Sequence, residues 1–444
     1  MATPDDDGHD DGHHDGHDRG QDHGPHDVAR RQRSRRRRDS PALETVLLAS
    51  TACLLAAVAW PIATGSRARD PENIVADPQL AAPNSGGSVP AMQLPTPSQG
   101  APTFQIALLL DTSSSMDGLI DQARSRLWSV VNALDGATFH GATPRLEVAI
   151  YEYGNDGIAF ANGHIRQVVG FTPELDRVSQ ALFALSTNGG SEFAPQAITR
   201  SLDELAWRDG EGVLRMVYVA GNEEFQQGPV AWTDAVDRAR ARGVVVNSIY
   251  CGPDGAGDDV GWAQAATRAG GRHFNIDHNT RAVDPPTPYD DEIGRLGVAI
   301  NGTYVGYGNE GALGVMNQSE QDSNSVAVGS AVVRGLSKSM SNYRNPSWDL
   351  VDGVAEGVVD LQTIVPDALP EALRGLDAAE LAAFVASRRA ERAAIAARLT
   401  ELREQRDGFL RQHAGETPSN SLDGAMIEGM AAQAEAAGFT MRHS

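Results

Sequence analysis

Cysteine and lysine are almost missing from this chain of 444 residues. Two cysteines, Cys53 and Cys251, are too few for a disulfide-stapled small protein or for a zinc site built from several cysteines. The only lysine is Lys338, so any Schiff-base chemistry would depend on that residue. Basic residues are also in the minority, because 37 Lys and Arg stand against 59 Asp and Glu and leave a formal net charge of −22. An acidic surface repels phosphate backbones, which argues against non-specific binding of nucleic acid.

The N-terminal charges are segregated by sign. Residues 1–27 hold nine aspartates and six histidines without apolar periodicity, and residues 28–40 hold seven arginines. A segment of this composition cannot bury a core, so residues 1–40 are predicted to form a disordered tail. Its histidines and aspartates have the chemistry to bind Ni²⁺ or Zn²⁺, although such tracts are usually only solvated.

An uncharged, mainly apolar segment follows at residues 45–66. A helix of this length, at about 1.5 Å per residue, spans the roughly 30 Å hydrocarbon core of a bilayer. The preceding arginines orient it with the N-terminus in the cytoplasm. We therefore expect a single-pass anchor in the cell membrane, with the rest of the chain extracytoplasmic. The alternative is a signal sequence whose cleavage leaves a secreted or periplasmic protein.

Composition divides the rest of the chain into five parts. Residues 67–102 are rich in Pro, Ala, Ser and Gly and predict a flexible linker. The main domain is predicted at 103–280, followed by an irregular extension at 281–365, a helical region at 366–414 and a tail with a short helix at 415–444.

One apolar stripe marks the predicted helical region. Ile395, Leu399, Leu402 and Phe409 share a helix face with heptad-like spacing, but for only about two repeats. A coiled coil between two chains and packing back on the same chain both remain open, and the short repeat favours the second.

Strands and helices alternate through residues 103–280. Apolar runs predict strands at 104–110, 146–154, 214–220, 244–251 and 272–276. Helical periodicity predicts helices at 118–134, 174–185, 194–207, 231–241 and 259–270. This alternation predicts an α/β fold with a central, mainly parallel sheet flanked by helices. In such a sheet, ligands bind beyond the carboxyl ends of the strands.

A polar turn follows the first predicted strand. It reads Asp111-Thr112-Ser113-Ser114-Ser115-Met116 and leads into the first predicted helix. This Asp-x-Ser-x-Ser pattern resembles that of von Willebrand factor type A (VWA) domains, whose order of elements also fits residues 104–277. The resemblance implies a Rossmann-like α/β domain with a metal-ion-dependent adhesion site. There, oxygen ligands bind Mg²⁺ or Mn²⁺, and an acidic side chain of a partner protein completes the coordination.

Two loops match the family pattern residue by residue. Asp111, Ser113 and Ser115 fit the first loop. The second loop, Asn188-Gly189-Gly190-Ser191-Glu192-Phe193, resembles the family's Gly-Gly-Thr-Asp turn, with Ser191 in the threonine position.

The third loop departs from the pattern. Gly221 stands where the family usually has an aspartate, and Asn222 and Glu223 follow it. Loss of a carboxylate is expected to weaken metal binding. The metal ligands that the resemblance implies are therefore Asp111, Ser113, Ser115, Ser191 and Asn222.

Four further segments resemble those of an exported or membrane-anchored bacterial VWA subfamily: 220–225, 301–308, 321–325 and 343–353. Considered without the resemblance, their polar and aromatic residues are typical of turns and packing rather than of a ligand site.

Three classes of function remain. The first is a non-catalytic binding module of the bacterial cell envelope, for protein–protein interaction or adhesion through the metal site. The second is a metal-independent scaffold subunit of a membrane complex, which the Gly221 substitution favours. The third is a serine hydrolase, for which the chain lacks a G-x-S-x-G motif. Its triad would join a serine of residues 113–115 to Asp111 and to His140, His164 or His273.

Overall fold

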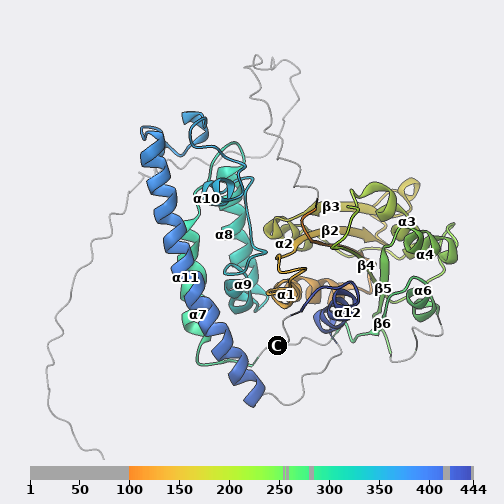
Figure 1. Ribbon diagram of the computed structural model, residues 1–444. Coiled ribbons are helices and arrows are strands. Elements are labelled where there is room, and N and C mark those ends of the chain that lie inside the picture. Colours follow the sequence, from red (N-terminus) through yellow and green to blue (C-terminus); the bar gives the residue numbers. More distant parts are fainter. Residues whose placement is uncertain (1–99, 254–255, 257–259, 280–284, 414–420, 442–444) are drawn as a thin grey trace, which may run out of the picture. The chain divides into compact units, whose positions relative to one another are not determined.

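The computed structural model describes residues 100–253, 256, 260–279, 285–413 and 421–441 (Figure 1). The predicted tail, membrane segment and nearly all of the linker lie outside these residues. Among the described residues, none of the helices combines the length and the apolar character needed to cross a bilayer.

A six-stranded sheet forms the centre of the described region, in the order β3-β2-β1-β4-β5-β6 (Figure 1). Its strands are β1 Thr103–Asp111, β2 Arg145–Tyr153, β3 Arg166–Thr172, β4 Val213–Gly221, β5 Val245–Tyr250 and β6 His273–Asn275. All neighbouring strands are parallel except β2 and β3, which are antiparallel. The predicted α/β fold with a mainly parallel sheet is confirmed.

Helices cover both faces of this sheet. One face packs on α1 Asp117–Ala133, α2 Leu175–Phe183 and α12 Leu422–Ala436, and the other on α3 Ala194–Glu204, α4 Trp232–Ala241 and α6 Trp262–Arg268. All nine residues of β1 are buried. Ile106 and Leu108 contribute to the first apolar layer, whereas Ala107 and Leu109 contribute to the second. A continuous apolar run is therefore what this central strand requires.

The edge strand β3 was not among the predicted strands. It begins with two exposed polar residues, Arg166 and Gln167, contains Gly170, and is only partly buried along the rest of its length. Its sequence therefore lacks the apolar run that marks the buried strands, and the strand exists because it pairs with β2.

The prediction of an irregular extension at 281–365 is wrong. This segment contains α7 Asp290–Ala299, α8 Gly311–Ala327, α9 Ala331–Ser337 and α10 Leu350–Ala355. The sequence of α8 shows no apolar helical periodicity, because its buried side is polar and includes Gln321 and Ser325. Its apolar residues Leu313 and Met316 are instead 60% and 67% exposed. An apolar stripe, the usual sign of a surface helix, is absent here. Short 3₁₀ turns complete the described elements: η1 Phe160–Asn162, η2 Ile300–Thr303, η3 Pro366–Ala368 and η4 Glu371–Leu373.

The long helix α11 Ala378–His413 packs on its own chain. It contacts α7, α9, α10 and η2, and the predicted stripe residues Leu399 and Leu402 are fully buried in the core that includes α1. Arg403 on α11 also pairs with Asp135, at 2.7 Å. The structure therefore shows α11 packed on its own chain, which is the second of the two alternatives.

Two glycines on α7 give a stability prediction. A methyl group on Gly297 would lie 2.9 Å from the Cα atom of Gly335 on α9, whereas Gly294 faces open space. Gly297→Ala is expected to lower the free energy of unfolding by about 1–3 kcal/mol, because two backbones must separate. Gly294→Ala, the matched control, is expected to raise it by about 0.5–1 kcal/mol. Urea titration of both variants tests this, and equal effects would contradict the close helix contact.

Candidate functional site

The first two loops meet where β1 ends. Asp111 is the last residue of β1, and β4, which ends at Gly221, lies beside it. Helices α2 and α3 pack on opposite faces of the sheet, and the connection between them passes the end of β1, where Asn188 donates its N–H to the carbonyl oxygen of Thr112 at 2.9 Å. That connection carries the loop 188–193, which therefore comes to the end of β1.

Hydrogen bonds organise the first loop around Asp111. The backbone N–H of Ser113 donates to Asp111 Oδ1 at 2.7 Å. The hydroxyl oxygens of Ser113 and Ser115 are 3.1 Å apart, and Asn222 donates from Nδ2 to Ser115 Oγ at 3.0 Å. Four of the five predicted ligands, Asp111, Ser113, Ser115 and Asn222, thus form one connected cluster.

The second loop is bonded to the first. Ser114 donates its N–H to the carbonyl oxygen of Gly189 at 3.0 Å, and Gly189 donates its own N–H to Ser114 Oγ at 3.0 Å. Gly189 adopts a φ of +85°, and a Cβ there would lie 2.2 Å from the side chain of Asp156, so glycine is required. Within the described residues the Ser191 hydroxyl has no hydrogen bond, and its role as a ligand stays a prediction.

Gly221 is required by the packing around it. A Cβ at this position would lie 2.5 Å from the hydroxyl oxygen of Tyr153 and 3.1 Å from the ring of Trp262. Tyr153 is buried and donates its hydroxyl to the carbonyl oxygen of Ala220 at 2.8 Å. An aspartate cannot enter unless Tyr153 moves, so the third loop contributes no carboxylate at this position.

Glu192 is a site residue that the predicted ligand set missed. Its side chain is only 5% exposed and interacts with the carboxyl group of Asp111 and the hydroxyl of Ser113. Burial, followed by the charge of Asp111, raises the pKa of Glu192 to about 9, and burial raises the pKa of Asp111 to about 6. The signal was present in the sequence, because Glu192 occupies the aspartate position of the Gly-Gly-Thr-Asp turn.

One oxygen of this carboxyl pair is unsatisfied. Asp111 is 0% exposed, and its Oδ2 has no hydrogen-bond partner among the described residues. A buried carboxylate oxygen of this kind needs a proton or a cation. The donor set, two carboxyls with the hydroxyls of Ser113 and Ser115, is the hard oxygen chemistry that Mg²⁺ and Mn²⁺ prefer. Across the described residues, no group of three or more His, Cys, Asp or Glu side chains could hold a metal.

Among the described residues, none of the three histidines considered for a hydrolase has a hydrogen bond to a serine of residues 113–115. His273 Nδ1 lies 2.8 Å from Ser248 Oγ, and the His140 ring packs on Phe139. His164 packs between the rings of Phe160 and Phe193. Among the described residues, the Ser113 hydroxyl contacts Ser115 and the two carboxyl groups rather than a histidine.

Lys338 is buried and bonded to residues of the helices around it. Lys338 is 4% exposed, and its ammonium group donates to Gly297 O, Asn301 Oδ1 and Asp322 at 2.6–2.9 Å. Burial and the neighbouring Arg334 charge lower the pKa of Lys338 to about 8. A buried amine with three acceptors does not fit Schiff-base chemistry with an external carbonyl compound.

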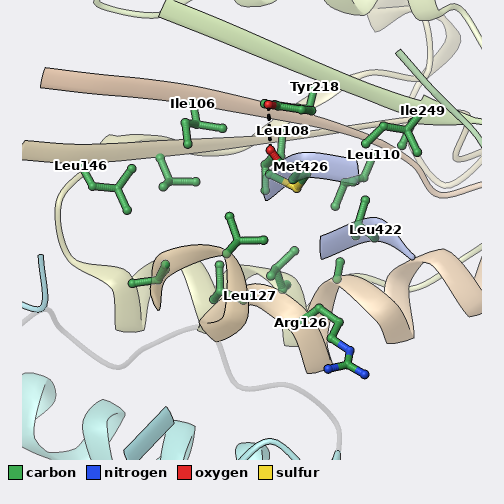
Figure 2. Close-up of a pocket in the computed structure, with 16 residues that line it drawn as sticks. Ile106, Leu108, Leu110, Arg126, Leu127, Leu146, Tyr218, Ile249, Leu422 and Met426 are labelled. Carbon is green, nitrogen blue, oxygen red and sulfur yellow. Dashed lines mark hydrogen bonds between the residues drawn. The ribbon is translucent and has the colours of Figure 1, made fainter. Parts of the chain in front are cut away.

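The apolar cavity below the sheet is a packing feature. Figure 2 shows it between the sheet, α1 and α12, with Leu108, Leu127 and Met426 among its walls. Its volume is about 30 Å³, which is room for only about two water molecules. It is too small for an organic ligand. A larger groove of about 610 Å³ lies between α2 and α8, away from the Asp111 cluster.

Comparisons with known proteins give weak similarities. No protein-family model matches the chain, and no curated protein matches it. A solved structure of proximal thread matrix protein 1 from the mussel byssus is similar at 13% identity and a TM-score of 0.31, over 40% of this chain and 42% of that one. An aerotolerance-related membrane protein from Bacteroides fragilis is similar at 14% identity and a TM-score of 0.29, over 40% of this chain and 93% of that one.

A third similar structure is that of the BatB protein from Bacteroides thetaiotaomicron, at 16% identity and a TM-score of 0.29, over 39% of this chain and 90% of that one. The chain spans less than half of the mussel protein. TM-scores near 0.3 carry no conclusion about function. The strand order and the loop after β1 agree with the VWA-like α/β architecture that the sequence resemblance predicts.

Proposed function

We propose that this protein is a non-catalytic binding module of the cell envelope that recognises another protein through the Asp111 cluster. Residues 45–66 would anchor it in the membrane. Asp111, Ser113, Ser115, Ser191 and Asn222 would hold Mg²⁺ or Mn²⁺, and an acidic side chain of the partner would complete the coordination.

The observation that carries the proposal is the unsatisfied Oδ2 of Asp111 beside the paired hydroxyls of Ser113 and Ser115. Asp111 is buried, whereas Ser115 is exposed and Asn222 is partly exposed. One side of the cluster therefore lies in the core and the other faces solvent. A cation at such a site keeps a coordination position that faces solvent. When bound, it would supply the positive charge that attracts a partner's carboxylate.

Substitution of Ser113 tests this function. Ser113→Ala in the full chain, purified in a nonionic detergent, is expected to reduce capture of its envelope partner at least tenfold, because a direct oxygen ligand is lost. EDTA is expected to have the same effect on the unchanged protein. Ser323→Ala, on the exposed side of α8, is the control and should capture as well as the unchanged protein.

Capture that withstands both Ser113→Ala and EDTA would refute the metal-dependent form of the proposal. It would favour the second candidate, a metal-free scaffold. One observation supports that candidate: Tyr153 and Trp262 occupy the space beside Gly221, so the third loop cannot supply the family's aspartate.

A further inference from the structure

Two buried carboxyl groups face each other at the end of β1. Asp111 is 0% exposed and Glu192 is 5% exposed. In the described part of the chain, neither has an ion pair with Arg, Lys or His. Taking two carboxyl groups out of water without a cationic partner is costly, and the cost falls only when a proton or a metal ion neutralises one or both.

A glycine lies beside both side chains. Gly154, which follows β2, has a φ of +80°, and a Cβ there would lie 2.6 Å from Asp111 Oδ1 and 3.0 Å from the Cγ atom of Glu192. Both side chains therefore lie against the same turn. The hydroxyl of Ser113 interacts with both carboxyl groups, and its backbone N–H donates to Asp111 Oδ1 at 2.7 Å, so the three residues form one cluster.

Gly221 lies beside that same cluster. A Cβ built there would lie 3.3 Å from Asp111 Oδ2, the oxygen without a donor. The third loop thus approaches the unsatisfied oxygen but brings no side chain to it. Glu192, on the second loop, is 5% exposed and interacts with the carboxyl group of the same Asp111 side chain. A glutamate has one more methylene group than an aspartate and therefore a longer reach.

We propose that Glu192 supplies the second carboxylate of the cation site, in place of the carboxylate that Gly221 lacks. This inference rests on the metal-binding part of the proposed function. The site then carries two negative charges from Asp111 and Glu192, with the hydroxyls of Ser113 and Ser115 beside them. The reduced affinity expected from the Gly221 substitution is offset by a carboxylate on another loop.

The experiment is calorimetric titration of the full chain with MnCl₂, in a nonionic detergent. Glu192→Gln is expected to weaken Mn²⁺ binding at least tenfold, because an amide replaces a carboxylate in the same space. Glu223→Gln is the matched control, since Glu223 is exposed and adjacent to the site, and it is expected to change affinity less than threefold. Asp111→Asn identifies the heat that belongs to this site rather than to the Asp/His-rich residues 1–27.

The folded state of the variant is checked separately. A glutamine at position 192 has nearly the volume of the glutamate and an N–H that can donate to the Asp111 carboxyl group, so the metal-free variant is expected to melt within a few degrees of the unchanged protein. If Glu192→Gln binds Mn²⁺ as tightly as the unchanged protein while Asp111→Asn does not, Glu192 is no ligand, and the proposed function stands without it. If the unchanged protein shows no Mn²⁺ binding that Asp111→Asn removes, the metal-dependent function and this inference both fail.

Discussion

Arg334→Met is expected to lower the free energy of unfolding by about 3–5 kcal/mol, because it removes one partner of a buried ion pair. Arg334 is 1% exposed and Asp176 is 2% exposed, and the guanidinium Nη1 lies 2.7 Å from Asp176 Oδ1. Methionine fills the volume but leaves a charge without its counterion. Urea titration of the full chain, followed by circular dichroism, measures the loss.

Two controls separate the buried charge from lost packing. The double variant Arg334→Met/Asp176→Asn removes both charges of the pair. It is expected to recover part of the free energy of unfolding that Arg334→Met loses, because no unpaired buried charge remains. Arg398→Met removes an exposed pair with Glu292 and is expected to cost no more than about 1 kcal/mol. A single Arg334→Met variant as stable as the unchanged protein would mean that Asp176 is neutralised in another way.

The position of Arg334 explains why its loss should affect the whole described region. Its guanidinium lies 4.5 Å from the ring centroid of Trp128 on α1, pairs with Asp176 on α2 and pairs with Asp322 on α8. The residue itself belongs to α9. One side chain thus joins α8 and α9, which belong to the extension at residues 281–365, to α1 and α2, which cover the sheet. The extension is expected to unfold together with the sheet rather than as an independent unit.

The sequence predicted most of the sheet because buried strands carry a strong signal. The run 104–110 had to be apolar on both faces, and the structure places it at the centre. The edge strand β3 and helix α8 carried no comparable signal, since their stability comes from partners distant in sequence. Ser179 on α2, for example, bonds to Gln321 on α8 at 2.8 Å, a polar contact that no periodicity reveals.

The candidate site was predictable as a set of loops but not as a set of contacts. Resemblance to a family pattern brought Asp111, Ser113 and Ser115 together correctly. The same pattern indicated only that position 221 lacks the family's aspartate. Only three-dimensional packing shows that Tyr153 fills the space beside Gly221 and that Glu192 lies against Asp111. Contacts of this kind between separate loops cannot be read from a single sequence.

The C-terminal segment is also a structural part of the sheet domain. After α12, Thr440 forms an antiparallel bridge with Thr138, in the connection between α1 and β2. The ring of Phe439 is 4% exposed, and its centroid lies 4.6 Å from that of Phe104 and 4.9 Å from that of Phe139. A residue close to the end of the chain therefore completes the core at the beginning of the first strand.

Phe439→Ala is expected to lower the free energy of unfolding by about 3–5 kcal/mol, because it leaves a cavity beside the rings of Phe104 and Phe139. The control is Phe160→Ala, whose ring is 75% exposed and whose replacement should change stability by no more than about 0.5 kcal/mol. Urea titrations followed by both tryptophan fluorescence and circular dichroism give the two values, and coincident curves show that unfolding is two-state. Equal stability of the two variants would mean that the C-terminal segment does not pack on β1 in solution. The expected loss of stability in Phe439→Ala would show instead that residues 437–441, which follow α12, are needed for the fold that holds Asp111, Ser113, Ser115 and Asn222 together.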